Sequence, residues 1–153
     1  MIAGHTAAVQ RAIEGAKARG AKRAVLLPVS VPVHTSLMRG AADRLAGKLK
    51  NVAIRKPQIR YISAVDAEAH LEPADLQELL VRQLPSPVRW LDTVRALAAD
   101  TGIAQLVECG PGKVLTGLNR RIEKRPGLEF MALEDPASVE AALAAVKGVS
   151  NAE

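Results

Sequence analysis

Apolar residues along this chain repeat in two ways, at helical spacing and in short continuous runs. Recurrence at every third or fourth position predicts helices over residues 6–19, 37–49, 73–84, 88–97, 114–122 and 136–146. Short apolar runs bounded by turn-forming or charged residues predict strands over residues 22–27, 58–62, 103–107 and 128–133, with a strand stub at 2–3 and a loop at 66–71. Strands that alternate with helices are typical of an α/β fold with a largely parallel sheet.

Local signals support several of these boundaries. Thr6 and Asp135 have side-chain oxygens that can cap the first and the last predicted helix. Pro73 fits the first position of a helix, where its missing amide costs nothing. Two prolines between residues 28 and 33 exclude a helix there. This segment is therefore expected to be extended and to lead into His34.

Composition places the chain among globular proteins. Its 153 residues, 48% of them hydrophobic, fit one domain or part of a larger one. The single cysteine excludes an internal disulfide, which suits a reducing compartment. The first eleven residues have no apolar core of signal-peptide length, and no apolar run approaches the length of a membrane span. These features predict a cytoplasmic location and no membrane partner.

Charge is unevenly distributed along the chain. Residues 1–61 contain 12 Lys and Arg against 2 Asp and Glu, whereas residues 62–153 contain 9 against 14. The basic half could face an acidic partner, a phosphate-bearing ligand or nucleic acid, or it could be a solvated surface. Nucleic acid is not expected, because three scattered aromatic residues provide no stacking platform.

His34 is the first candidate for chemistry. It follows the apolar run at residues 24–33, and active-site groups of parallel α/β folds gather where strands end. A histidine there titrates near neutral pH and can relay a proton. From position alone, the alternative is a structural histidine bound by backbone groups. That alternative is stronger for His5 and His70, which lie in polar loops, and no metal-ligand spacing is present.

Three further positions have weaker signals. The GPGK segment at residues 110–113 is too short for a phosphate-binding loop and its proline removes an amide donor, so it is interpreted as a strand-to-helix turn. Cys109 precedes this turn without the flanking glycines of a nucleophile elbow, and a buried, inert thiol is expected. Gln83 ends a leucine-rich helix. Its side chain taken alone is a surface amide, but its backbone carbonyl is free to accept a hydrogen bond.

Three segments together resemble malonyl-CoA:acyl-carrier-protein transacylases of bacterial fatty-acid synthesis. They are LPVSVPVH at residues 27–34 with Leu37 and Met38 behind it, LVRQL at 80–84 running through PVRW at 87–90, and VECGPGKVLTGL at 107–118. Their order and spacing also match, so the resemblance covers nearly all of the chain.

The resemblance implies the C-terminal half of a hydrolase-like parallel-sheet core, over residues 28–153, and part of a ferredoxin-like small subdomain, over residues 1–27. It implies transfer of malonyl from malonyl-CoA to the phosphopantetheine thiol of acyl carrier protein through a serine ester, with a coenzyme A thioester as substrate and no cofactor. His34 falls on the family's catalytic histidine, which would take the proton of the serine and later protonate the leaving thiolate. Gln83 falls on the residue whose backbone carbonyl holds the other ring nitrogen.

The family's nucleophile lies in a G-H-S-[LV]-G elbow, which no serine of this chain matches. The resemblance places that elbow, the malonyl-binding arginine and the glutamine of the oxyanion hole upstream of the matched region. The chain is therefore expected to be inactive alone. Val33 precedes His34 at a position where the family often has serine, and it would line the acyl pocket. Thr35 follows His34 at a position where the family usually has cysteine or serine. Two alternatives stay open, a non-catalytic fragment that binds acyl carrier protein and an inactive truncated product.

Overall fold

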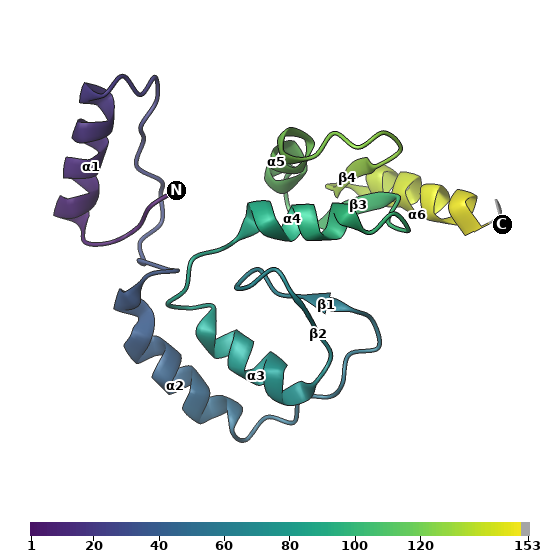
Figure 1. Cartoon of the computed structure of the whole chain (residues 1–153), viewed down its shortest axis with the longest axis horizontal. Helices are drawn as coiled ribbons and strands as arrows, with labels where there is room; N and C mark the ends of the chain where they lie inside the picture. The colour runs from purple at the N-terminus through teal and green to yellow at the C-terminus, as the bar shows by residue number, and fades with distance from the viewer. Residues whose placement is uncertain (151–153) are drawn as a thin grey trace. The chain divides into compact units, whose positions relative to one another are not determined.

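The chain divides after Arg89 into two units, Met1–Arg89 and Trp90–Glu153. The computed structural model describes residues 1–150, and their side chains as far as Val146 (Figure 1). The first unit contains α1 (Thr6–Ala18), a short 3-10 helix η1 (Ser36–Met38), α2 (Arg39–Leu49), β1 (Tyr61–Ile62), β2 (Ala69–His70) and α3 (Pro73–Arg82). The second contains α4 (Trp90–Ala99), β3 (Gln105–Cys109), α5 (Val114–Ile122), β4 (Glu129–Leu133) and α6 (Pro136–Ser150).

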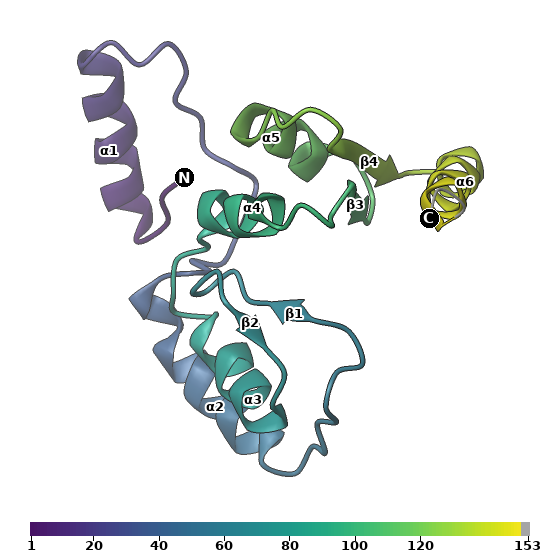
Figure 2. The same ribbon diagram turned by 45° about the vertical axis from the view of Figure 1, so that its right-hand side comes forward.

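Helices α2 and α3 pack side by side in the first unit (Figures 1 and 2). Each has apolar residues three and four positions apart, and the helices bury Ala42 of α2 and Leu79 of α3 to 4% and 3% exposure. Burial of such a face, rather than intrinsic propensity, stabilises helices of this length. Gln77 of α3 also donates from Nε2 to the carbonyl of Leu49, which has no donor within α2. These contacts fix the position of α3, and the residue that follows α3 is Gln83.

Strands β3 and β4 of the second unit pair in parallel over five residues, from Gln105 opposite Glu129 to Cys109 opposite Leu133. Helix α5 connects the two strands, and α5 and α6 both contact β4. The hydroxyl of Thr116 in α5 donates to the carbonyl of Met131 at 3.0 Å, which ties the connecting helix to the sheet. The parallel pairing and the helical crossover confirm the predicted α/β class.

Two helix starts agree with their sequence signals. Pro73 occupies the first turn of α3. Asp135 precedes α6, and its Oδ1 accepts from the backbone N–H of Ser138 at 2.8 Å. The hydroxyl of Ser138 accepts in return from the N–H of Asp135 at 2.9 Å. The bond from the Ser138 backbone, together with that from its side chain, holds the pKa of Asp135 below its usual value.

Several predicted elements are wrong. Residues 2–3 and 22–27 form no strand in the described chain, because no described segment pairs with their backbone groups and a strand needs such a partner. The predicted loop at 66–71 contains β2, which pairs antiparallel with the shortened strand β1. Thr6 lies inside α1 instead of capping it. The predicted strand at 103–107 starts two residues later, at Gln105, and the predicted helix at 88 starts at Trp90.

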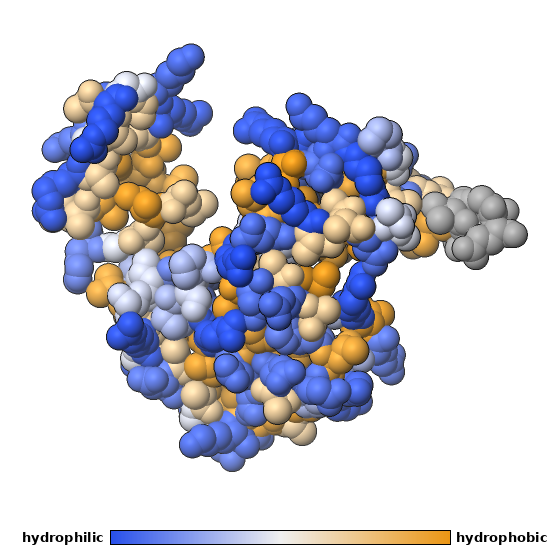
Figure 3. Space-filling view, in the orientation of Figure 1, coloured by the Kyte–Doolittle hydropathy of each residue, from blue (hydrophilic) through white to orange (hydrophobic). Residues whose placement is uncertain are grey.

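The failed strand at 22–27 leaves apolar side chains in solvent. Val25, Leu26 and Leu27 are between 45% and 64% exposed. Apolar residues at the surface are also visible in Figure 3, among hydrophilic ones. The predicted division into subdomains at residue 27 is a statement about the family fold, and it stays a prediction.

Candidate active site

His34 lies in the loop between the extended segment and η1, and its backbone is left-handed, with φ at 63°. Thr35 closes this loop, because its Oγ1 donates to the carbonyl of Pro32 at 2.7 Å and accepts from the N–H of Leu37 at 3.3 Å. A left-handed conformation costs a non-glycine residue about 1–2 kcal/mol. Residues held in this way by their surroundings are frequent at functional sites.

The end of α3 binds His34 through two hydrogen bonds. Nδ1 of the ring lies 2.9 Å from the carbonyl oxygen of Gln83. The backbone N–H of His34 donates to the carbonyl of Leu84, also at 2.9 Å. Gln83 is the C-cap of α3, and the last carbonyls of a helix have no donor within it. The predicted contact between ring and carbonyl is confirmed, whereas the catalytic roles of His34 and Gln83 stay predictions.

The Gln83 carbonyl determines the tautomer of the ring. A carbonyl oxygen only accepts, so Nδ1 must carry the proton in this hydrogen bond. Nε2 then has a free lone pair and can accept a proton from another group. His34 is exposed, so Nε2 is open to a reaction partner.

Asp66 lies beside the same helix end, in the loop between β1 and β2. Its side chain is 18% exposed and forms ion pairs with His70, at 3.2 Å, and with Arg82, the last residue of α3. Burial by itself raises the pKa of Asp66, but hydrogen bonds from His70 and from the N–H of Glu68 and the charges of His70 and Arg82 outweigh it and leave the pKa below its usual value. His70 therefore has the structural role that its loop context favoured.

Sequence patterns do not single out Asp66. The residues that bind it from α3 and beyond, Arg82 and Arg89, lie 16 and 23 positions away in the chain. Contacts at such separations leave no periodic signal. A carboxylate close in space to the last turn of the helix becomes visible only when the chain is folded.

The GPGK turn in the second unit is a strand-to-helix turn, as predicted. Gly112 has a left-handed backbone, with φ at 88°. The carboxylate of Glu108 accepts from the N–H of Thr116 at 2.7 Å and from that of Leu115 at 3.1 Å, and these bonds hold the pKa of Glu108 below its usual value. The amides at the start of α5 are thus already occupied, which argues against an anion site there.

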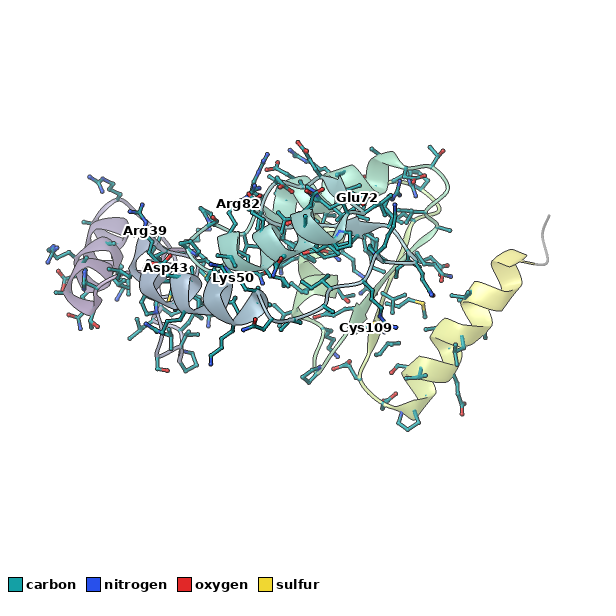
Figure 4. All side chains as sticks on the ribbon, turned by 90° about the horizontal axis from the view of Figure 1, so that it is seen from below. Arg39, Asp43, Lys50, Glu72, Arg82 and Cys109 are labelled. Carbon is teal, nitrogen blue, oxygen red and sulfur yellow. The ribbon has the colours of Figure 1, made fainter. Side chains whose placement is uncertain are left out.

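Cys109 is exposed, so the expected burial of its thiol is wrong. Alternate residues of a strand point to the same side, and Cys109 shares its side of β3 with Val107, which is 36% exposed. Figure 4 labels Cys109.

Among the described residues, no group of three or more His, Cys, Asp or Glu could hold a metal ion. None of the described helices has the length and apolar character needed to cross a membrane.

Comparison with known proteins gives the same family throughout. The sequence model of the family described as "Acyl transferase domain" matches residues 1–142. The malonyl CoA-acyl carrier protein transacylase of Salmonella typhimurium is 47% identical over 143 residues, which are 94% of this chain and 45% of that protein.

Solved structures agree with the sequence matches. The malonyl-CoA:acyl carrier protein transacylase of Xanthomonas oryzae pv. oryzae has a TM-score of 0.86 at 45% identity, and the match covers 93% of this chain and 44% of that one. A structure of a type II PKS acyl-carrier protein in complex with its malonyl-transacylase has a TM-score of 0.84 at 44% identity, over 92% of this chain and 44% of that one. The chain spans less than half the length of these relatives. It belongs to the acyl transferase domain family, and it matches the C-terminal part of the bacterial malonyl CoA-acyl carrier protein transacylases.

Proposed function

We propose that this chain supplies the proton relay of an acyltransferase that moves malonyl from malonyl-CoA to the phosphopantetheine thiol of acyl carrier protein, in fatty-acid synthesis. The main support is the 2.9 Å contact between Nδ1 of His34 and the carbonyl of Gln83 in a member of the acyl transferase domain family. This contact leaves Nε2 as the one basic nitrogen of the ring.

In the first half-reaction, Nε2 of His34 accepts the hydroxyl proton of a serine from the part of the enzyme that this chain does not contain. The serine oxygen bonds to the thioester carbonyl of malonyl-CoA, and the carbon–sulfur bond breaks. The positive ring then gives its proton to the coenzyme A thiolate. A malonyl ester on the serine and free coenzyme A remain.

In the second half-reaction, Nε2 accepts the thiol proton of the phosphopantetheine. The sulfur bonds to the ester carbonyl, the carbon–oxygen bond breaks, and the ring returns the proton to the serine oxygen. His34 ends in its starting state, so the cycle is balanced without a cofactor. The Gln83 carbonyl keeps the proton on Nδ1 throughout, so that Nε2 is free at the start of each half-reaction.

The remaining features of the family fold belong to this proposal. They are a hydrolase-like core over residues 28–153, a ferredoxin-like subdomain that includes residues 1–27, and a cytoplasmic location. TM-scores of 0.84 to 0.86 against transacylase structures support the fold.

A chimera tests the proposal. The N-terminal part of the Salmonella typhimurium relative, joined to this chain at the start of the matched region, would restore a full-length enzyme. His34→Ala in the chimera is expected to lower the rate of malonyl transfer by about 10²–10⁴-fold, because it removes the general base. His5→Ala is the matched control. His5 is the N-cap residue of α1, and its side chain makes no capping hydrogen bond that the substitution would remove. A near-normal rate for His34→Ala would refute the proposal.

The isolated chain offers a second test of the same proposal. After incubation with malonyl-CoA, the intact mass is expected to show no malonyl ester, because the chain lacks the serine elbow. A stable adduct on one of its serines would show that the nucleophile has been assigned to the wrong part of the enzyme.

One observation favours a second candidate, a fragment that binds acyl carrier protein without chemistry. All 12 Lys and Arg residues of the basic half, residues 1–61, are exposed. Figure 4 labels two of them, Arg39 at the start of α2 and Lys50, the residue that follows α2. Electrostatic docking of an acidic carrier protein would weaken steeply as salt screens these charges. Salt-sensitive binding of carrier protein, combined with no malonyl transfer by the chimera, would favour this candidate.

A further inference from the structure

We infer that Asp66 is a positioning residue, which holds the end of α3 where the Gln83 carbonyl meets the ring of His34. This inference rests on the proposed function in one respect only, the catalytic role of the His34 ring. The positioning role of Asp66 is argued from contacts within the first unit. Sequence patterns do not reveal this residue.

The segment from Arg82 to Arg89 is tied at both ends to the Asp66 loop, residues 63–68. At the first end, the Arg82 guanidinium binds Oδ2 of Asp66. At the second end, Nη1 of Arg89 donates to the carbonyl of Asp66 at 3.0 Å and its backbone N–H donates to the carbonyl of Ala64 at 2.8 Å. The two carbonyls that bind His34 lie between these ties. Movement of the Asp66 loop would therefore move the acceptors of His34.

The Asp66 loop is itself firmly held. Ser63 is 1% exposed, its hydroxyl accepts from the N–H of Val65 at 3.2 Å, and its carbonyl accepts from the N–H of Ala67 at 2.8 Å. Ala67 is left-handed, with φ at 65°. A residue keeps a costly conformation only where its surroundings hold it, and here the hydrogen bonds of the loop do so. It can serve as a fixed support for the end of α3.

Asp66 is the carboxylate best placed to hold Arg82. The other one, Glu78, lies 3.7 Å from Arg82 and its side chain is 72% exposed. An ion pair so open to solvent contributes little. The Arg82 side chain, labelled in Figure 4, is 43% exposed. Because its pair with Asp66 is open to water on one side, that pair also adds little to global stability. Its main effect is on where the adjacent carbonyl of Gln83 lies.

The test reads the tautomer of His34 in the full 153-residue chain, without any substrate. Long-range nitrogen–proton NMR correlations of the ring distinguish the Nδ1–H from the Nε2–H form, and His34→Gln assigns the signals. In the unmodified chain the Nδ1–H form is expected to dominate. In Asp66→Ala the ratio of Nδ1–H to Nε2–H is expected to fall by about fivefold, the equivalent of one hydrogen bond of ordinary net strength. Glu78→Ala is the matched control, with an unchanged ratio.

Arg82→Gln provides a second variant, because it removes the same ion pair from its more exposed side and keeps the Asp66 carboxylate. It is expected to lower the ratio in the same direction. An unchanged ratio in Asp66→Ala, with the helical circular dichroism preserved, would overturn the inference. Loss of the fold in both variants would also overturn it, because Asp66 would then be a residue of general stability. Failure of the chimera assay for His34 would leave the tautomer result intact, so the two ideas fail separately.

Discussion

The left-handed backbone of His34 leads to a prediction that separates its chemistry from its effect on stability. The φ of His34 is 63°. Such a conformation costs a non-glycine residue about 1–2 kcal/mol. The hydrogen bond between Nδ1 and the Gln83 carbonyl returns about 1 kcal/mol. Because the two nearly cancel, the histidine side chain is expected to add almost nothing to the free energy of unfolding.

Three substitutions at this position separate the two contributions. His34→Gly removes both the backbone strain and the ring bond, so its free energy of unfolding is expected within about 1 kcal/mol of the unmodified chain. His34→Ala loses the bond and keeps the strain, and it is expected to be about 1 kcal/mol less stable. His34→Val places a β-branched side chain in a left-handed conformation, at a cost of about 2 kcal/mol or more. The bond from the backbone N–H to Leu84 is retained in all three.

Urea unfolding followed by far-UV circular dichroism measures these differences, because α1, α2 and α3 of the same unit supply a helical signal. With a slope of about 2 kcal/mol per molar urea, a difference of about 1 kcal/mol moves the midpoint by about 0.5 M. The urea midpoint is expected to be highest for His34→Gly, lower for His34→Ala and lowest for His34→Val. A glycine variant less stable than the alanine variant would refute the reasoning, because it would show that the backbone at position 34 is not strained.

Three further predictions concern the second unit, where the only tryptophan, Trp90, reports unfolding by fluorescence. The guanidinium of Arg125 donates to the carbonyl of Ala98 in the last turn of α4 and to two carbonyls beyond that helix, those of Asp100 and Ile103. Arg125→Ala is therefore expected to cost about 3 kcal/mol. Lys124→Ala is the exposed control, and equal urea midpoints for the two variants would contradict this role. The side chain of Val94 is fully buried. Val94→Ala is therefore expected to cost about 2 kcal/mol, and a midpoint unchanged in urea would argue against that packing. The folded-state pKa of Glu108 is lowered by its bonds to helix amides. The stability it adds is fully present above the unfolded pKa, near 4.5, and is lost as pH falls through the folded pKa. Urea midpoints of the unmodified chain and Glu108→Gln are therefore expected to differ at neutral pH and to converge in acid, and a difference that persists in acid would contradict the mechanism.

Helices were the most predictable elements because their signal is local. The periodicity of apolar residues placed α2, α3 and α5 within a few residues of their observed bounds, and Pro73 and Asp135 marked two starts correctly. Strands were less predictable, because a strand exists only where a second segment pairs with it. Residues 22–27 have a strand-like composition and form none, whereas residues 69–70 have no such pattern and pair with β1.

The candidate site divides in the same way. His34 was expected from its place after an apolar run, and Gln83 from its place at a helix end together with the family resemblance. Asp66 and its two arginine partners had no sequence signal, since an ion pair between distant residues follows from no spacing rule. The exposure of Cys109 could not be predicted from the sequence either, because it depends on which side of the β3–β4 sheet remains uncovered.

The order of amino acids alone determined the α/β class, the helix positions and the family motifs around His34, because each depends on neighbours within a few turns of the chain. Only the tertiary structure decided that the backbone of His34 is left-handed, and that Asp66 forms an ion pair with Arg82 at the helix end that binds the ring. The physical reason is that hydrogen-bond partners and backbone strain are set by atoms brought together through packing, and the linear sequence does not contain those distances.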